Sequence, residues 1–247
     1  MNDAVRRWLM LQRDLGGDEV ILDAPPPATN LPAVDKADWR KGAPPIPGPG
    51  MSVTSQSVPG TADWPTLDEI AAVVRACPKC PLCRTRTHAV PGEGNPRAGL
   101  LVVGEGPGES EDLSGRPFVG RAGELLDKML AAIEIPRAEV YIANVVKCRP
   151  PKNRVPLPEE REACMPYLRR QIELVQPRVL MALGGTAAET LLGVKASLGQ
   201  LRLKVHQWNG IPLIVTYHPA ALLRNPNWKR PAWDDVRIAR QLLDRGA

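Results

Sequence analysis

The sequence predicts an α/β protein, a three-layer α/β/α sandwich with a mainly parallel central sheet, preceded by a disordered N-terminal arm. Two observations predict this division. From about residue 64 onward, short apolar runs alternate with segments of helical periodicity, which is typical of a parallel sheet covered by helices on both faces. Residues 24–60, by contrast, hold nine of the 27 prolines together with many Ser, Thr and Gly, a composition that cannot assemble a core.

The arm is expected to have two parts. Val5, Trp8 and Leu9 recur at helical spacing, so residues 1–23 could contain a short amphipathic helix. Such a helix could dock on a partner protein, pack on its own domain or fray, and the sequence leaves these alternatives open. Residues 24–63 are interpreted as an extended, disordered linker, so the folded domain is predicted to span residues 64–247.

The first element of the domain is a helix that begins at a capping box, Thr66 and Glu69, and runs toward Cys77. The segments that follow alternate between apolar runs of strand length and amphipathic segments of helix length. Strands are expected at 100–103, 140–146, 178–183 and 211–219, and helices at 122–135, 159–175, 186–193 and 233–244.

Polar residues gather after three of these strands. "GEGPGE" occupies residues 104–109, "NVVKCRPP" residues 144–151 and "YHPAALLRN" residues 217–225. Ligand sites of parallel sheets form at the carboxyl ends of the strands, so we expect the functional site there. The "GEGPGE" turn resembles a dinucleotide-binding loop, but that pattern needs glycine where Glu109 stands, and Pro107 would stiffen the turn.

The charge is divided unevenly along the chain. Residues 1–63 carry 6 Lys and Arg against 8 Asp and Glu, and the remainder carries 26 against 19, so a basic domain follows a slightly acidic arm. This suits a polyanion such as nucleic acid, although many basic proteins bind none. No apolar run approaches the roughly 18 residues of a membrane span, and the N-terminus lacks the features of a signal peptide. We therefore expect a cytoplasmic protein that does not enter a membrane.

The five cysteines lie at 77, 80, 83, 148 and 164. An odd number without an export signal argues against a disulfide framework and favours metal ligation or free thiols. The C-x2-C pair Cys77 and Cys80, with the distant pair Cys148 and Cys164, suits zinc or an iron–sulfur cluster. Cys83 leaves an ambiguity, because C-x2-C-x2-C could also supply three ligands.

Phe118 is the only phenylalanine in the chain, and it lies in a polar, glycine-bracketed loop, "GESEDLSGRPFVG". Together with "CPKCPLCRTRT", "VVGEGPGE", "VYIANVVKCRPPKNR" and "YHPAALLRNP", this loop resembles the family 4 uracil-DNA glycosylases, which carry an iron–sulfur cluster. The resemblance covers residues 75–245 and leaves residues 1–63 aside. It implies a structural [4Fe-4S] cluster held by Cys77, Cys80, Cys148 and Cys164.

The resemblance also implies roles for Phe118 and for two side chains at the strand ends. Phe118 would stack on a uracil extruded from DNA. Asn144 would read the base, because its carbonyl accepts from uracil N3–H and its NH2 donates to O4, whereas cytosine would mispair both bonds. His218 would donate an N–H to uracil O2 as negative charge develops there.

The carboxylate at the sugar is expected to be Glu105, which could stabilise the cationic deoxyribose or orient the attacking water. Glu109 and Glu111 are rivals for this role. The backbone amide of Gly106 would contact the base edge.

The DNA-binding residues are expected at Lys147, Arg149, Leu222, Leu223 and Arg224, where the basic side chains hold phosphates and the leucines enter the minor groove as a wedge. The expected activity is hydrolysis by a monofunctional uracil-DNA glycosylase, since no lysine in the catalytic motifs could form a Schiff base. The alternative is a non-catalytic iron–sulfur module that binds DNA and recruits a polymerase or repair partner. We expect a monomer that binds single- or double-stranded uracil-containing DNA, is nucleoid-associated through that DNA, and could bind a protein partner through its arm.

Overall fold

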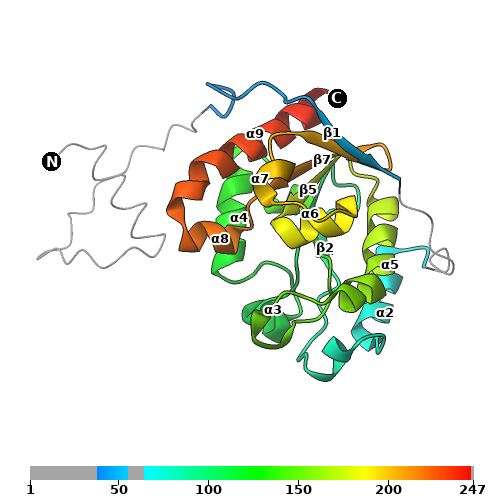
Figure 1. The fold of residues 1–247 in the computed structure, drawn as a ribbon. Helices are drawn as coiled ribbons and strands as arrows, with labels where there is room; N and C mark the ends of the chain where they lie inside the picture. The colour runs from blue at the N-terminus through cyan, green and yellow to red at the C-terminus, as the bar shows by residue number, and fades with distance from the viewer. Residues whose placement is uncertain (1–37, 55–63, 246–247) are drawn as a thin grey trace, which may run out of the picture.

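The structure is a computed structural model that describes residues 38–54 and 64–245. In these residues the chain forms one sheet with the strand order β1-β6-β7-β5-β3-β4-β2 (Figure 1). The strands are β1 Pro49–Val53, β2 Glu93–Gly94, β3 Leu100–Gly104, β4 Val140–Asn144, β5 Val179–Leu183, β6 Val205–Trp208 and β7 Ile211–Thr216. The helices are α2 Leu67–Ala76, α3 Glu109–Ser114, α4 Arg121–Ala132, α5 Pro158–Val175, α6 Gly185–Leu192, α7 Leu198–Leu201, α8 Pro219–Arg224 and α9 Lys229–Arg245.

The centre of the sheet is parallel, as expected. β4, β3, β5 and β7 run in one direction, whereas β6 is antiparallel to β7 and β2 is antiparallel to β4. The carboxyl ends of the four parallel strands therefore share one edge. Their register places Gly104 of β3 opposite Asn144 of β4 at that edge.

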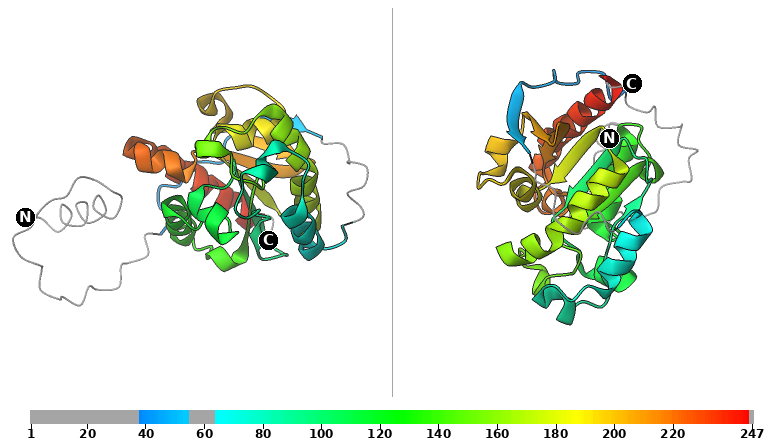
Figure 2. Two further views of the ribbon diagram at one scale, coloured as in Figure 1. Left: turned by 90° about the horizontal axis from the view of Figure 1, so that it is seen from below. Right: turned by 90° about the vertical axis from the view of Figure 1, so that its right-hand side faces the viewer.

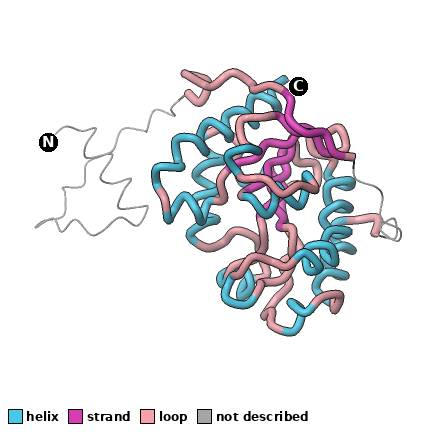
Figure 3. Tube along the Cα trace, in the orientation of Figure 1, coloured by secondary structure: helices cyan, strands magenta, loops and turns pink. Residues whose placement is uncertain are grey.

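Helices cover both faces of the sheet (Figure 2, right; Figure 3). Alternate residues of β3 point to opposite faces. Leu101 and Val103 pack in a core with residues of α5, α6 and α7, while Leu100 and Val102 pack in a second core with residues of α4 and α9. The predicted three-layer α/β/α sandwich is therefore confirmed.

All nine elements expected after residue 64 are present, with ends that differ by a few residues. Thr66 caps α2, and both halves of the predicted capping box are formed, because Thr66 Oγ1 accepts from Glu69 N and Glu69 Oε2 accepts from Thr66 N. The structure also contains six elements that the sequence did not predict, namely β1, β2, β6, α3, α7 and α8. Each has only two to six residues, too few to show a hydrophobic period.

One boundary differs from the expectation. Residues 38–54 fall in the segment interpreted as disordered linker, yet Trp39 is buried in the core beneath α9, and β1 pairs in parallel with β6. The segment between them follows α9, where Arg237 donates to Lys41 O and Gln241 donates to Pro44 O. Prolines do not prevent this pairing, because β1 is an edge strand with only one neighbour. The expectations for residues 1–37 and 55–63 lie outside the described residues.

The described helices include none that combines the length and the apolar character needed to cross a membrane.

Candidate active site

The expected site residues Phe118, Asn144 and His218 lie together at the carboxyl edge of the sheet. β4 ends at Asn144, and β7 ends at Thr216, two residues before His218. Phe118 comes from the loop between α3 and α4, and its ring centroid is 5.5 Å from that of His218. Residues that are 26 to 100 positions apart in the chain therefore line one small space.

Gly104 provides the room for this arrangement. A Cβ atom at residue 104 would lie 2.7 Å from Phe118 Cζ and would also collide with the side-chain oxygen of Asn144. The absence of a side chain at the end of β3 thus lets the Phe118 ring and the Asn144 amide approach each other. Phe118 itself is buried and has a φ of +51°, an uncommon conformation for a bulky residue that the surrounding loop must hold.

Asn144 is buried, with 1% of its surface exposed. Its Oδ1 atom has no hydrogen-bond partner among the described residues. Buried side-chain oxygens are nearly always hydrogen-bonded, so an unpaired one at the edge of a site indicates an acceptor kept for a ligand.

His218 is the N-cap of α8, where its Nδ1 accepts a hydrogen bond from Ala220 N at 3.2 Å. An imidazole nitrogen that accepts carries no proton, which assigns the proton of the neutral ring to Nε2. The pKa of His218 is lowered to about 4, chiefly by burial and also by the charge of Arg224, while Glu111 opposes the shift. At neutral pH the ring is therefore uncharged and offers one N–H donor.

The loop that carries Phe118 is held from two sides. Glu111 accepts from Gly108 N with one carboxylate oxygen and from Val119 N and Gly120 N with the other, at 2.9–3.0 Å. Arg137 donates to the carbonyl oxygens of the two residues Pro117 and Phe118, at 2.6 and 3.0 Å. It also pairs with Asp127 and Glu93.

These contacts separate the three candidate carboxylates. The Glu111 carboxylate accepts hydrogen bonds from three backbone amides and thereby holds the loop in place. The side chain of Glu109 is 71% exposed and lies 3.6 Å from Arg149. Glu105 is half-buried directly after β3, and Gly106 next to it is packed so closely that an added Cβ would lie 2.7 Å from Val146. Of the three, Glu105 lies nearest in sequence to the strand end that forms the site.

Comparisons with known proteins agree with this geometry. Residues 91–237 match the family model of the uracil DNA glycosylase superfamily. A type-4 uracil-DNA glycosylase of Pyrobaculum aerophilum is 48% identical over 168 residues, which cover 65% of this chain and 86% of the relative. The chain belongs to the type-4 uracil-DNA glycosylases. The enzymes of that name from Saccharolobus solfataricus and Thermotoga maritima are each 45% identical to this chain. Each alignment covers 72% of this chain, together with 86% of the Saccharolobus enzyme and 95% of the Thermotoga enzyme.

Two of the expected DNA-binding residues of this family member are not available to DNA. Lys147 is 1% exposed, and its Nζ donates to Asn144 O at 2.9 Å and to Gln171 Oε1 at 2.6 Å. Leu222 is also 1% exposed, because it anchors α8 in a cluster with Leu125 and Ala232. The sequence placed both in basic or wedge-like runs, but it does not indicate which member of a run turns inward.

The other expected DNA-binding residues lie nearer the surface. Arg224 is exposed, and Leu223 is partly buried against the same cluster as Leu222. Arg149 is partly exposed and donates to Asn153 Oδ1 at 2.8 Å. These three side chains remain candidates for contacts with DNA.

Of the four cysteines expected to hold a cluster, Cys77 caps the end of α2, Cys80 lies in the turn that follows, Cys148 lies in the segment after β4, and Cys164 lies in α5. A hydrogen bond between Cys80 and Cys164 lowers the pKa of Cys80 to about 6 and raises that of Cys164. Burial raises the pKa of Cys148, as do the charges of Cys80 and Cys77, while Arg86 opposes the shift. Among the described residues, however, no three His, Cys, Asp or Glu side chains form a ready-made metal site.

The chemistry around these sulfurs fits a cluster. Arg86 Nη1 donates to Cys148 Sγ at 3.0 Å, and the Tyr167 hydroxyl donates to Cys77 Sγ at 3.2 Å. Donors aimed at sulfur stabilise thiolates, which are the form that binds iron.

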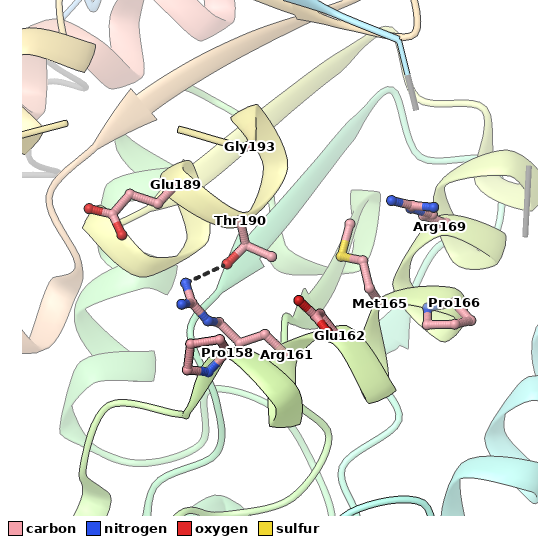
Figure 4. Close-up of a pocket in the computed structure, with 9 residues that line it drawn as sticks. All are labelled: Pro158, Arg161, Glu162, Met165, Pro166, Arg169, Glu189, Thr190 and Gly193. Atoms are coloured by element: carbon pink, nitrogen blue, oxygen red, sulfur yellow. Dashed lines mark hydrogen bonds between the residues drawn. The ribbon is translucent and has the colours of Figure 1, made fainter. Parts of the chain in front are cut away.

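A separate cavity of about 380 Å³ lies between α5 and α6 (Figure 4). Arg161 and Glu162 of α5 face Glu189 and Thr190 of α6 across it, and Arg161 hydrogen-bonds to Thr190 Oγ1 at 3.3 Å. None of the expected catalytic or base-binding residues lines this cavity, so its size does not make it the active site.

The sequence did not predict that Arg137 contacts the Phe118 loop. Glu111 was expected only as a rival to Glu105, whereas it accepts hydrogen bonds from the backbone of the same loop. A signal for Glu111 existed, because a Glu three residues after Gly108 at the start of a helix matches the second half of a capping box. No local pattern links Arg137 to Phe118, which lies 19 residues earlier.

Proposed function

We propose that the protein is a monofunctional uracil-DNA glycosylase that hydrolyses the N-glycosidic bond of uracil in DNA and leaves an abasic site. The observation that carries this proposal is the convergence of Phe118, the unpaired Asn144 oxygen and the neutral His218 on one space at the strand ends. The relatives named uracil-DNA glycosylases support the same substrate. Such an activity initiates base-excision repair of deaminated cytosine.

The base would be recognised by Asn144 and Phe118. Asn144 accepts from uracil N3–H with the oxygen that has no partner among the described residues, while its NH2 group donates to O4. Cytosine has an acceptor at N3 and a donor at position 4, so both bonds would be mispaired at a cost of about 1–3 kcal/mol each. The Phe118 ring covers one face of the extruded base, a contact worth about 1–3 kcal/mol.

The leaving group would be stabilised by His218. When the bond between N1 and C1′ breaks, its electron pair stays on uracil and places negative charge on O2. The Nε2–H of a neutral imidazole donates to that oxygen, and the charge of nearby Arg224 favours the anion. Because Nδ1 is occupied by Ala220 N, the ring keeps one orientation.

The deoxyribose cation would be stabilised by Glu105, which could also orient the water that attacks C1′. The engagement of Glu111 with three backbone amides and the exposure of Glu109 favour Glu105 over its two rivals. Gly106, close to Val146, would present its amide to the base edge.

We also propose that Cys77, Cys80, Cys148 and Cys164 hold a [4Fe-4S] cluster. Its contribution would be structural, because it would cross-link α2, the segment after β4, and α5. Asn144 is the last residue of β4, and Cys148 lies four residues further along the chain, so the cluster would brace the strand end that carries the base-reading residue.

The test is release of uracil from a labelled oligonucleotide that bears a single uracil, followed by alkali, with thymine and cytosine oligonucleotides as controls. We expect alkali-dependent cleavage at uracil alone and its loss in His218→Ala. Iron-loaded wild-type protein that binds uracil-DNA but releases no uracil would overturn the proposal and support the non-catalytic DNA-binding module instead.

A further inference from the structure

An exposed aromatic stack lies beside the proposed active site. The rings of Tyr217 and Trp228 are stacked, with centroids 5.0 Å apart and planes 14° from parallel. Tyr217 directly precedes His218, so the stack begins one residue from the proposed leaving-group donor. Trp228 keeps 40% of its surface exposed, although large aromatic side chains are usually well buried.

Arg202 packs against the Tyr217 ring of the stack and holds it in place. The guanidinium of Arg202 lies 4.5 Å from the centroid of the Tyr217 ring. Arg202 is fixed in turn by the buried Asp235 at 2.7 and 3.0 Å and by Pro231 O at 2.7 Å. An aromatic surface that is held in place before binding loses little conformational freedom when a flat ligand stacks on it.

Cationic residues flank Trp228 in the sequence. Arg224 at the end of α8 is exposed, and Lys229 follows Trp228 directly. Burial lowers the pKa of Lys229, and the charge of Lys128 on α4 lowers it further. α8 packs against α4 (Figure 1; Figure 2, left) through Leu222 and Leu125, and Lys128 lies three residues after Leu125 on α4. Like charges held together favour an anionic ligand between them.

We propose that Trp228 stacks on an unpaired base of the uracil-bearing strand next to the extruded uracil, while Lys128, Arg224 and Lys229 hold the adjacent phosphates. Combining an aromatic platform with a positive surface is the general way in which proteins bind single-stranded nucleic acid. A base inside a duplex has both faces covered by its neighbours, so this platform favours uracil in single-stranded DNA. This inference rests on the proposed function and adds a strand preference to it.

The test compares the full-length wild-type protein with Trp228→Ala and Trp228→Phe on single-stranded and double-stranded oligonucleotides that carry one uracil. We expect Trp228→Ala to lower kcat/KM on the single strand by about 5- to 150-fold, through KM, with a smaller effect on the duplex. Trp228→Phe should retain most of the activity because it keeps a stacking ring. Met51→Ala is the matched control, since Met51 is 39% exposed on the distant edge strand β1.

A second measurement identifies the stacked base. Each base near the uracil is replaced in turn by an abasic spacer, and binding and uracil release are both measured. At one position, the spacer oligonucleotide should bind the wild type more weakly than the intact oligonucleotide does. Trp228→Ala should bind these two oligonucleotides equally well. Equal losses at every position, or equal losses on single and double strands, would overturn the inference. Wild-type protein that shows this position-specific binding without releasing uracil would overturn the proposed function and leave the platform standing.

Discussion

Asn144 presents its side-chain amide and His218 its ring N–H to the space beside Phe118, and each is fixed by a different neighbour. Lys147 holds the backbone oxygen of Asn144, while Ala220 N holds the ring of His218. At the scale of the residue, the hydrogen bonds that these neighbours make therefore determine which atoms of Asn144 and His218 stay free to contact a base. That arrangement makes specific predictions for both residues.

Asn144→Asp should abolish most uracil release while the protein stays folded. A carboxylate keeps the shape of the amide but loses the NH2 donor for uracil O4, at a cost of about 1–3 kcal/mol for that bond alone. The measurement is kcat/KM on a uracil oligonucleotide, together with a thermal melt. Asn95→Asp is the control, because Asn95 uses only its oxygen, which accepts from Arg97 N. Equal activity in the two variants would contradict the assignment of Asn144.

His218 should make stability depend on pH. Its pKa is lowered from 6.5 to about 4 in the folded protein, so between these values the unfolded chain binds a proton that the folded protein does not. The free energy of unfolding should therefore fall as the pH is lowered from about 6.5 to about 4, and this group should contribute no further change below about 4. Urea unfolding of the wild type and of His218→Gln across this range measures the effect. A slope that is the same in both proteins would show that His218 is not its source.

At the scale of elements, the loop between α3 and α4 is held in place by segments that are remote in the sequence. Glu111 fixes it from α3, and Arg137 fixes it from the turn before β4. β1 is the edge strand farthest from β4 and β2, and among the described strands it pairs only with β6. Met51 N of β1 also donates a hydrogen bond to His206 Nδ1 of β6 at 3.0 Å.

Arg137→Lys should lower kcat/KM for uracil release by about tenfold or more. A lysine keeps the charge but cannot donate at once to Pro117 O, Phe118 O and two carboxylates, and hydrogen bonds to charged groups contribute about 1.5–3 kcal/mol each. Arg116→Lys is the matched control, since Arg116 pairs with Glu93 but is largely exposed. Similar kinetics for the two variants would mean that Arg137 does not position Phe118.

Gly50→Ala should weaken the attachment of β1. The added Cβ would lie 2.6 Å from His206 Nδ1, the atom that accepts from Met51 N, and overpacking of this kind costs about 1–3 kcal/mol. We expect a lower Tm but nearly unchanged uracil release, because β1 is at the far edge from β4. Gly48→Ala is the control, since a Cβ there meets no atom within 4 Å. If both variants melt at the same temperature, the contact with His206 does not hold β1 in place.

At the scale of the whole molecule, the proposed cluster would tie together segments that the sheet alone does not connect. α2 contacts α5 through a small core of its own, which includes Ile70, Val74 and Tyr167, and Cys77 packs against it, whereas the other three expected ligands pack in or against the larger core that includes Leu101. We therefore expect the cluster to affect the stability of the domain before it affects the chemistry.

Cys80→Ser should lose iron and melt at a lower temperature, whereas Cys83→Ser should keep both its iron and its Tm. Cys80 hydrogen-bonds to Cys164, and the charges of Cys77 and Cys80 raise the pKa of Cys148, so these thiols lie within reach of one another. Cys83 is the fifth thiol and is not among the four expected ligands. The measurements are iron per chain and Tm on anaerobically purified protein. Iron that is lost from Cys83→Ser and retained in Cys80→Ser would reverse the assignment of these two residues.

The sequence by itself determined the α/β class, the nine longer elements, the strand ends that form the site and the family. Periodicity, capping residues and motif order are local properties, and each is complete within a few residues of the chain. The same reasoning placed Asn144 and His218 at one edge of the sheet, because parallel strands share their carboxyl ends, whereas Phe118 was assigned to the site by the family resemblance.

Only the tertiary structure decided what each polar or apolar side chain faces. Lys147 and Leu222 turn inward, Glu111 and Arg137 brace the loop, residues 38–54 join the folded domain, and Trp228 stays exposed on Tyr217. Each outcome depends on a partner that is distant in the sequence or on the room left by neighbouring side chains. A run of basic residues or prolines carries no information about such partners, which is why these assignments required the packed chain.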